Sequence, residues 1–198
     1  PRGPAGDALI TKDNFRLTSL PAGAVVATGS VRRERQLCWK RPDLKVADLR
    51  GNVPTRLRKL SESESWSGII LARAGLDRLG LSLEMEFLSE EDFVPAGGQG
   101  VIALQVRRDD ERVQRLVAPI NHEATRLCLR AEREFLRLLN GDCDSPVGVQ
   151  ASITDAKLYL RAQVFEPGIS APRAGRVSGA IAQPEALAAQ LMSKLYGD

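Results

Sequence analysis

Short apolar runs alternate with helix-forming segments through the first half of the chain. The apolar runs have the length of buried strands and cover residues 24–27, 45–49 and 69–72. Segments of helical composition follow them at residues 32–40, 54–60 and 75–79. Alternation of this kind requires crossover connections, and it predicts a mostly parallel sheet with helices on both faces. We expect a polar loop at residues 61–67.

A different pattern begins after a Pro/Gly-rich hinge at residues 94–100. A strand is expected at 101–106 and a helix near 110–117. Apolar residues then recur about every 3.6 positions, from the expected N-cap Asn121 to about residue 139. Further strands and a last helix are expected at residues 147–153, 157–165, 175–181 and 184–196. This pattern predicts a small α+β unit, in which one antiparallel sheet carries helices on one face.

Arginine recurs where the expected strands give way to helices. The three apolar runs are followed by Arg32 and Arg33, by Arg50 and Arg56, and by Arg73 and Arg78. A strand that ends in a Gly-containing turn and opens a helix leaves free N–H groups beside the positive end of the helix dipole. Guanidinium groups there bind carboxylates or phosphates bidentately. Because ligands bind beyond the carboxyl ends of such strands, the three turns predict a site for a ligand with several acidic groups.

Composition limits the class of protein. The 198 residues carry a net charge of +3, and 22 of the 28 basic residues are Arg. This bias fits anion recognition, although a GC-rich genome would produce the same bias. Nucleic acid is a poor fit, since the five Phe, two Trp and two Tyr are not interleaved with basic runs. No apolar stretch has the length of a membrane span or the pattern of a signal peptide, so we expect a cytoplasmic protein.

Cysteine and histidine offer little conventional catalytic chemistry. Cys38, Cys128 and Cys143 are an odd number without a CxxC pair, which argues against a disulfide framework and a zinc site. We expect no metal. The single histidine, His122, is expected in the first turn of a helix, where a solvated or capping role is favoured over a general base. Hydrolase, zinc-protease and P-loop motifs do not occur.

Cys143 lies in an expected surface turn, GDCDSP, between a helix and a strand. Two flanking aspartates oppose thiolate formation, and no adjacent His or Lys activates the thiol, so a turnover nucleophile is not expected. From the residues alone an ordinary turn cysteine is favoured, and a thiol that reacts once with a strong electrophile remains an alternative.

Six spaced segments resemble, in order, the signature segments of the porphobilinogen deaminase (hydroxymethylbilane synthase) family. They are ATGSVRRERQL (27–37), RPDLKVADLRGNVPTRLRKL (41–60), GIILARAGLDRLGL (68–81), VPAGGQGVIALQVR (94–107), NHEATRLCLRAEREFL (121–136) and NGDCDSPVG (140–148). This chain departs from the family at Gly29, where Ser is common, at Pro54, where Gly is common, at Gly98, and at Asp144 and Ser145. No departure removes an arginine or the cysteine that the family uses.

The resemblance implies an enzyme of tetrapyrrole biosynthesis. Members of the family join four porphobilinogen molecules head to tail and release ammonia. The chain grows on a dipyrromethane cofactor bound through a thioether to a cysteine, here Cys143. Each pyrrole brings an acetate and a propionate. The residues implied to hold cofactor are Thr28, Ser30, Arg32, Arg33, Arg50, Asn52, Gly75 and Gln99. Those implied to hold substrate are Arg50, Arg56 and Arg78. A cytoplasmic monomer is expected.

The resemblance also implies three parts. Residues 1–95 would form a periplasmic-binding-protein-like α/β domain, residues 96–119 a hinge and return segment belonging to another domain, and residues 120–198 the cysteine-bearing α+β domain. The chain begins with PRGPAG and no Met, so we expect a piece of a longer protein. The family's catalytic carboxylate is expected upstream of Pro1, because Asp43, Asp48 and Asp77 lie within other matched segments. We therefore expect no deaminase activity from this chain alone.

Two other classes stay open from the residues. An anion-binding receptor or effector-domain module would bind its ligand reversibly and leave Cys143 unmodified. A folded but catalytically silent relative of the enzyme is the second alternative.

Overall fold

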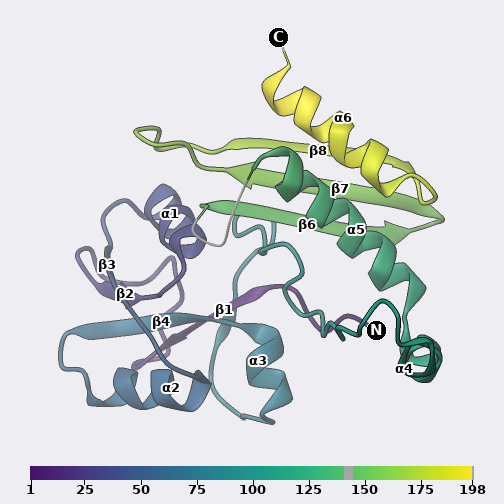
Figure 1. Ribbon diagram of the computed structural model, residues 1–198. Helices are drawn as coiled ribbons and strands as arrows, with labels where there is room; N and C mark the ends of the chain where they lie inside the picture. The colour runs from purple at the N-terminus through teal and green to yellow at the C-terminus, as the bar shows by residue number, and fades with distance from the viewer. Residues whose placement is uncertain (141–144, 198) are drawn as a thin grey trace.

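The computed structural model describes residues 1–140 and 145–197, and it shows an α/β unit beside a smaller α+β unit (Figure 1). The first unit contains β1 (Asp7–Thr11), β2 (Val25–Ala27), α1 (Val31–Lys40), β3 (Lys45–Ala47), α2 (Val53–Glu62), β4 (Trp66–Ala72), α3 (Arg73–Arg78) and β5 (Glu86–Phe87). After it come α4 (Glu111–Val117), the 3₁₀ turn η1 (Ala118–Ile120), α5 (Glu123–Leu138), β6 (Val147–Thr154), β7 (Lys157–Val164), β8 (Arg173–Ala180) and α6 (Pro184–Tyr196). No helix among the described residues combines the length and the apolar character needed to cross a membrane.

The first sheet has the order β3-β2-β4-β1-β5 and is mixed. β2 pairs in parallel with β3 and β4, as expected, but β1 pairs antiparallel with both β4 and β5. The sequence pattern missed β1 and β5. Strand β1 begins with the charged Asp7, so its short run DALIT lacks a continuous apolar signal, and β5 has only two residues. The polar loop is also shorter than expected, because α2 continues to Glu62 and β4 starts at Trp66.

Helices cover both faces of this sheet, as predicted. Leu60 of α2 and Leu76 of α3 pack with Ile69 on one face. Leu37 of α1 packs with Ile70 on the other face, since successive residues of a strand point to opposite sides. The strand that supplies these two isoleucines, β4, is therefore buried on both faces.

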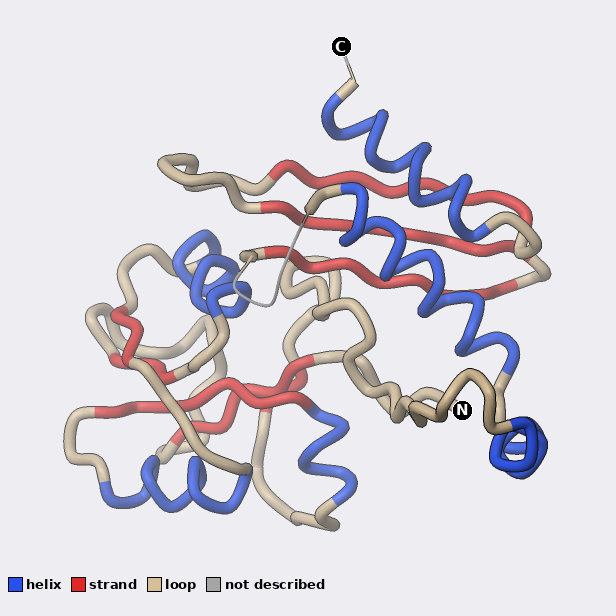
Figure 2. Tube along the Cα trace, in the orientation of Figure 1, coloured by secondary structure: helices blue, strands red, loops and turns tan. Residues whose placement is uncertain are grey.

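The C-terminal unit is an antiparallel sheet, β6-β7-β8, with α5 and α6 on one face (Figures 1 and 2). Alternate residues of the strands, such as Val149 and Leu160, pack under Phe135 of α5 and Leu191 of α6. This arrangement and its boundaries confirm the expected α+β unit to within two residues at each element end.

Helix α5 begins one residue later than expected. His122, rather than Asn121, is the N-cap, and its Nδ1 accepts a hydrogen bond from the Thr125 N–H at 3.2 Å. An imidazole nitrogen that accepts from a free N–H of the first turn stabilises the helix start. The capping role favoured for His122 is confirmed, whereas the N-cap assignment to Asn121 was wrong.

Residues 101–106 do not form the expected strand. Ile102 and Leu104 have 76% and 58% of their surface exposed. A strand is stabilised by a paired neighbour, and the described chain brings no strand edge to this segment. The alternating pattern VIALQV thus has the sequence of a strand but lacks a sheet in this structure.

Buried side chains connect the two units. Gln36 of α1 donates through Nε2 to Gln163 Oε1 of β7 at 2.9 Å and to the Val94 carbonyl oxygen at 2.9 Å. Both glutamines are at most 2% exposed. Trp39 and Phe165 meet edge to face nearby, with ring centroids 6.2 Å apart. Helix α1 therefore packs directly on the C-terminal sheet.

A buried carboxylate on α5 forms a second connection. Glu132 accepts hydrogen bonds from the N–H groups of Gly98 and Ala151, each at 2.7 Å, and forms an ion pair with Arg2. The Arg2 Nε also donates to the Gln99 carbonyl oxygen at 2.8 Å. Glu132 thereby joins the N-terminal segment, the 94–100 segment and β6 at one point.

Candidate functional site

The carboxyl ends of β2, β3 and β4 lie at one edge of the first sheet, together with the amino end of β1. Ala27 and Ala47 are register partners, and Asp7 is the partner of Ala72. The arginine-bearing turns all leave this edge. The structure therefore brings together turns that are far apart in sequence, as the strand pattern predicted.

Hydroxyl groups shape the first of these turns. Thr28 Oγ1 accepts from the Ser30 N–H at 3.2 Å, and Ser30 Oγ caps α1 by accepting from the Arg33 N–H at 3.5 Å. The Thr28 N–H donates to the Ala47 carbonyl oxygen at 2.9 Å. Two residues expected to line the cofactor site are thus engaged within the turn, where they determine the start of α1.

Gly29 allows the first two turns to approach each other closely. A Cβ atom at this position would clash with the Leu49 carbonyl oxygen and touch Cδ of Arg50. Because the clashing atom belongs to the backbone, it cannot move aside as a side chain could. The glycine at this position therefore matters for the spacing between the turns.

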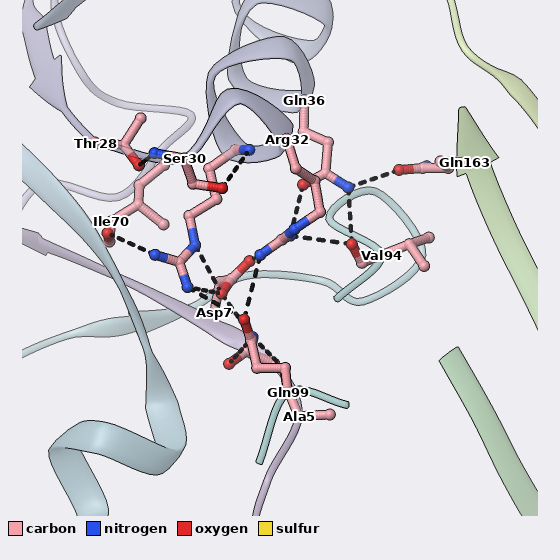
Figure 3. A network of polar contacts seen from close by, with 12 residues as sticks. Ala5, Asp7, Thr28, Ser30, Arg32, Gln36, Ile70, Val94, Gln99 and Gln163 are labelled. Carbon is pink, nitrogen blue, oxygen red and sulfur yellow. Dashed lines mark hydrogen bonds and ion pairs between the residues drawn. The ribbon is translucent and has the colours of Figure 1, made fainter. Parts of the chain in front are cut away.

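Arg32 and Arg33 both bind Asp7, in the buried network of Figure 3. Arg32 Nη1 donates to Asp7 Oδ2 at 2.8 Å. Arg33 donates to Asp7 Oδ1 through Nε at 3.0 Å, and its Nη2 lies 2.9 Å from the same oxygen. All three residues are less than 8% exposed. One carboxylate thus holds both of the guanidinium groups that the sequence assigned to cofactor.

Gln99 completes this network from the 94–100 segment. Its Nε2 donates to Asp7 Oδ1 at 2.9 Å and to the Ala5 carbonyl oxygen, while its Oε1 accepts from Arg32 at 3.4 Å and Arg33 at 3.3 Å. Arg32 Nη1 also donates to Gln36 Oε1 at 2.9 Å and to a backbone carbonyl oxygen at 3.0 Å. Gln99 is therefore part of the site, bound to both arginines.

The charges of the network lower the pKa of Asp7. Burial alone would raise it, but the positive charges of Arg32 and Arg33, with hydrogen bonds from Arg32 and Gln99, outweigh the desolvation. Burial also lowers the pKa of Arg32, against the attraction of Asp7. A carboxyl group with a lowered pKa stays ionised near neutral pH and is a weak base, so Asp7 serves here as a counter-ion.

Two further arginines lie nearer the surface. Arg50 is exposed and pairs with Asp48, with 3.1 Å between Nε and Oδ1. Arg56 Nε donates to the Gly51 carbonyl oxygen at 2.6 Å. Burial lowers the pKa of Arg56, and the positive charges of Arg33 and Arg50 lower it further. Arg50 and Arg56 thus form a positive region beside the buried network, close enough to Arg33 for its charge to act on Arg56.

Other predicted residues support these turns or lie apart. Asn52 Oδ1 caps α2 by accepting from the Thr55 N–H at 2.9 Å. Gly75 lies in α3, where an added Cβ would make an ordinary contact with Val53 at 3.4 Å. Arg78 is exposed in the last turn of α3, and no hydrogen bond or ion pair between described residues joins it to the other arginines.

Cys143, the predicted cofactor cysteine, lies outside the described residues. Of the other two cysteines, Cys38 is exposed on α1 and Cys128 is buried on α5. Burial is the main cause that raises the pKa of each thiol, followed by the charge of Glu34 for Cys38 and of Glu132 for Cys128. Neither thiol has the electropositive surroundings of an activated nucleophile.

Sequence reasoning missed Asp7 and Gln36. A signal for Asp7 was available, because an acidic residue at the start of a short apolar run needs a buried cationic partner. The partners, Arg32 and Arg33, lie more than twenty residues away and could be assigned only once β1 was placed beside β4.

Charged residues also line concave surfaces elsewhere on the described chain. A groove of about 620 Å³ lies on the C-terminal sheet and includes Tyr159, Arg161 and Arg176. Arg161 already pairs with Glu90 and Glu91, at 3.0 and 2.6 Å. The groove shares no residue with the strand-end site. Among the described residues, no group of three or more His, Cys, Asp or Glu side chains could hold a metal ion.

Replacing Asp7 by Asn should destabilise the protein by about 3–5 kcal/mol near neutral pH, because two buried guanidinium groups lose their counter-ion. Because the pKa of Asp7 is lowered, the difference in stability between the two proteins depends on pH. The stabilisation that ionised Asp7 gives the wild-type protein is complete above the pKa of Asp in the unfolded chain, about 4. It is lost as the pH falls through the lower pKa that Asp7 has in the folded protein. Urea unfolding of both proteins from pH 7 downwards measures the difference, and a gap that persists at the acid end would contradict the assignment.

Replacing Gly29 by Ala should destabilise the protein by about 1–3 kcal/mol, because the new methyl group displaces the Leu49 carbonyl from its place. The Gly75→Ala protein is the matched control. Its new methyl group has room, and alanine favours the helix by roughly 0.5–1 kcal/mol, so no loss is expected. Thermal unfolding of the two variants would show equal effects if the close approach at Gly29 were unimportant.

Two family models match the chain. The porphobilinogen deaminase dipyromethane cofactor binding domain matches residues 1–115, and the porphobilinogen deaminase C-terminal domain matches residues 126–197. The strand-end site thus lies within the part that resembles a cofactor binding domain.

Curated relatives agree with this match. A porphobilinogen deaminase of Thiobacillus denitrificans is 43% identical over 190 residues, which cover 96% of this chain and 62% of the relative. That of Syntrophotalea carbinolica is 41% identical over 196 residues, covering 98% and 62%. That of a Roseiflexus species is 48% identical over 159 residues, covering 80% and 52%. The chain spans about three fifths of the length of the first two relatives. With both models and these identities in agreement, the chain belongs to the porphobilinogen deaminase family.

Proposed function

We propose that this chain supplies the part of a porphobilinogen deaminase that holds the dipyrromethane cofactor and the growing oligopyrrole. The observation that carries the proposal is the position of Arg32, Arg33, Arg50 and Arg56 at one sheet edge, within residues that match the cofactor binding domain. The family match to both parts of the chain favours this function over a reversible anion receptor.

The residues present fit a ligand that bears several carboxylates. Arg32 Nε is buried and has no hydrogen-bond partner among the described atoms, so the network retains an unused donor. Arg50 and Arg56 add two cations, of which only Arg50 forms an ion pair between described residues. A charge-assisted hydrogen bond contributes about 1.5–3 kcal/mol. When bound, the cofactor supplies the pyrrole terminus to which porphobilinogen is added.

Each group of residues has a separate role in this proposal. Arg32 and Arg33, with Ser30, Thr28 and Gln99, hold the cofactor at the buried end. The exposed cations Arg50, Arg56 and Arg78 bind the acetate and propionate groups of incoming substrate, and Asn52 and Gly75 shape the turns between them. The carboxylate that assists proton transfer is provided by the part of the family's proteins that this chain does not match.

Cys143 is the proposed attachment point. Although it lies outside the described residues, β6 begins shortly after it in the chain (Figure 1). Gly148 of β6 packs so closely on the Val94 carbonyl that an added Cβ would clash, and the same carbonyl accepts from Arg32 at 3.0 Å. The start of β6 is therefore next to the buried arginines, which supports a tether from this turn.

We further propose the three-part division at residues 1–95, 96–119 and 120–198. The exposed apolar residues Ile102, Leu104 and Leu116 support the view that the middle part packs on residues outside this chain. A periplasmic-binding-protein-like arrangement of the complete protein, its monomeric state and its cytoplasmic location belong to the same proposal.

The division predicts how residues 101–106 exchange their amide hydrogens. In this chain they should exchange at nearly the unprotected rate, because no strand pairs with them. Joining the chain to the segment of the Thiobacillus relative that it does not match should slow their exchange by about tenfold or more. Mass-detected exchange measures both proteins, with β7 as the internal control, and equal rates at 101–106 would contradict the division.

Turnover of porphobilinogen tests the function itself. We expect no turnover from the 198-residue chain and measurable release of ammonia and hydroxymethylbilane from the joined protein. In the joined protein, Cys143→Ser should abolish activity and remove the dipyrromethane adduct from the intact mass. Cys38→Ser is the control, because that exposed thiol lies on α1. This variant should keep both the activity and the adduct. An adduct that survives in the Cys143→Ser protein would refute the attachment site.

A further inference from the structure

Arg32 and Arg33 share one buried counter-ion. Two positive charges and the single negative charge of Asp7 leave the cluster with one net positive charge. The other groups that face it, Gln36 and Gln99, are neutral. Arg56 is the additional cation close enough to repel Arg33. The buried end of the site therefore presents a charge that matches one carboxylate.

Contacts from several segments also restrict the orientation of both guanidinium groups. Asp7 binds them from β1, and the Val94 carbonyl accepts from Arg32 at 3.0 Å. The Ile70 carbonyl of β4 accepts from Arg33 Nη1 at 3.4 Å. Asp7 is the only one of these partners that binds both arginines with a full charge. Removing it would release both groups at once.

We propose that Asp7 is a positioning residue for ligand binding. It fixes the guanidinium groups of Arg32 and Arg33 in one orientation and reduces their combined charge to that of a single cation, so that this end of the site takes a single ligand carboxylate. The inference rests on the proposed function, in which that ligand is a pyrrole or dipyrromethane that carries several carboxylates.

The positioning role of Asp7 and simple electrostatics predict opposite changes in ligand affinity when the Asp7 carboxylate is removed. By charge alone, removal of the Asp7 carboxylate would strengthen the binding of any anion at this edge. If Asp7 orients the arginines, its removal weakens binding, because the two guanidinium groups repel each other and no longer align with the ligand. The direction of the change therefore separates the two accounts.

Calorimetric titration with a synthetic dipyrromethane bearing acetate and propionate side chains measures this direction. Asp7→Asn should weaken binding about tenfold or more, the equivalent of one lost charge-assisted contact. Asp7→Glu, which restores the charge, should recover most of the affinity. Asp43→Asn is the matched control, because Asp43 pairs with Arg41 at the surface, and it should leave binding unchanged. Equal or tighter binding by Asp7→Asn would overturn the proposal.

A second measurement needs no ligand. In the wild-type protein the Arg33 Nε–H donates to Asp7, so its hydrogen exchange, followed by nuclear magnetic resonance, should be about tenfold or more slower than that of the exposed Arg50 Nε–H. Asp7→Asn should remove most of this protection and Asp7→Glu should restore it. Exchange at Arg33 as fast as at Arg50 in the wild-type protein would overturn the positioning role, even if Asp7→Asn did not fold.

The two measurements also distinguish which idea fails. If the wild-type protein does not bind the dipyrromethane, the proposed function fails, and the exchange of Arg33 still decides the role of Asp7. If the wild-type protein binds and Asp7→Asn binds equally well, the proposed function stands and the positioning role fails.

Discussion

The buried ion pairs of Asp7 with Arg32 and Arg33 are the interaction on which the arginine-bearing edge of the first sheet depends. Two adjacent guanidinium groups that have lost most of their water would repel each other without a shared anion. Asp7 is held at the end of β1 by the antiparallel pairing with β4, so its position is set by the sheet and not by a loop. A site built on sheet ends in this way keeps its geometry when the surface turns move.

The edge combines an inner, fixed pair of cations with outer, exposed ones. Arg32 and Arg33 are bound on several sides, whereas Arg50 is three-quarters exposed and Arg56 is held mainly by a backbone carbonyl. Under the proposed function, a ligand that lengthens by one pyrrole at a time would need one end held in place and variable contacts along the rest. This division of rigid and adaptable cations is consistent with the family to which the chain belongs.

Sequence periodicity predicted most elements, because it records which face of each element is buried. It placed the parallel strands, their helices and the whole C-terminal unit, and it placed the arginines at the correct edge. The prediction failed for segments whose structure depends on pairing with neighbouring strands. The segment DALIT is a strand because β4 and β5 flank it, and residues 101–106 are not one because nothing pairs with them. The partner of each arginine likewise depends on tertiary pairing, which no local pattern contains.

The contacts of Glu132 have a consequence for how the two units can move relative to each other. One carboxylate with no exposed surface binds the Gly98 and Ala151 N–H groups and the Arg2 guanidinium. Rotation of the C-terminal unit away from the 94–100 segment would strip the Gly98 N–H and the Arg2 guanidinium from this carboxylate, while the Ala151 N–H would move with it. Loss of these two partners opposes separation, so the Glu132 contacts make the joint between the two units resist opening.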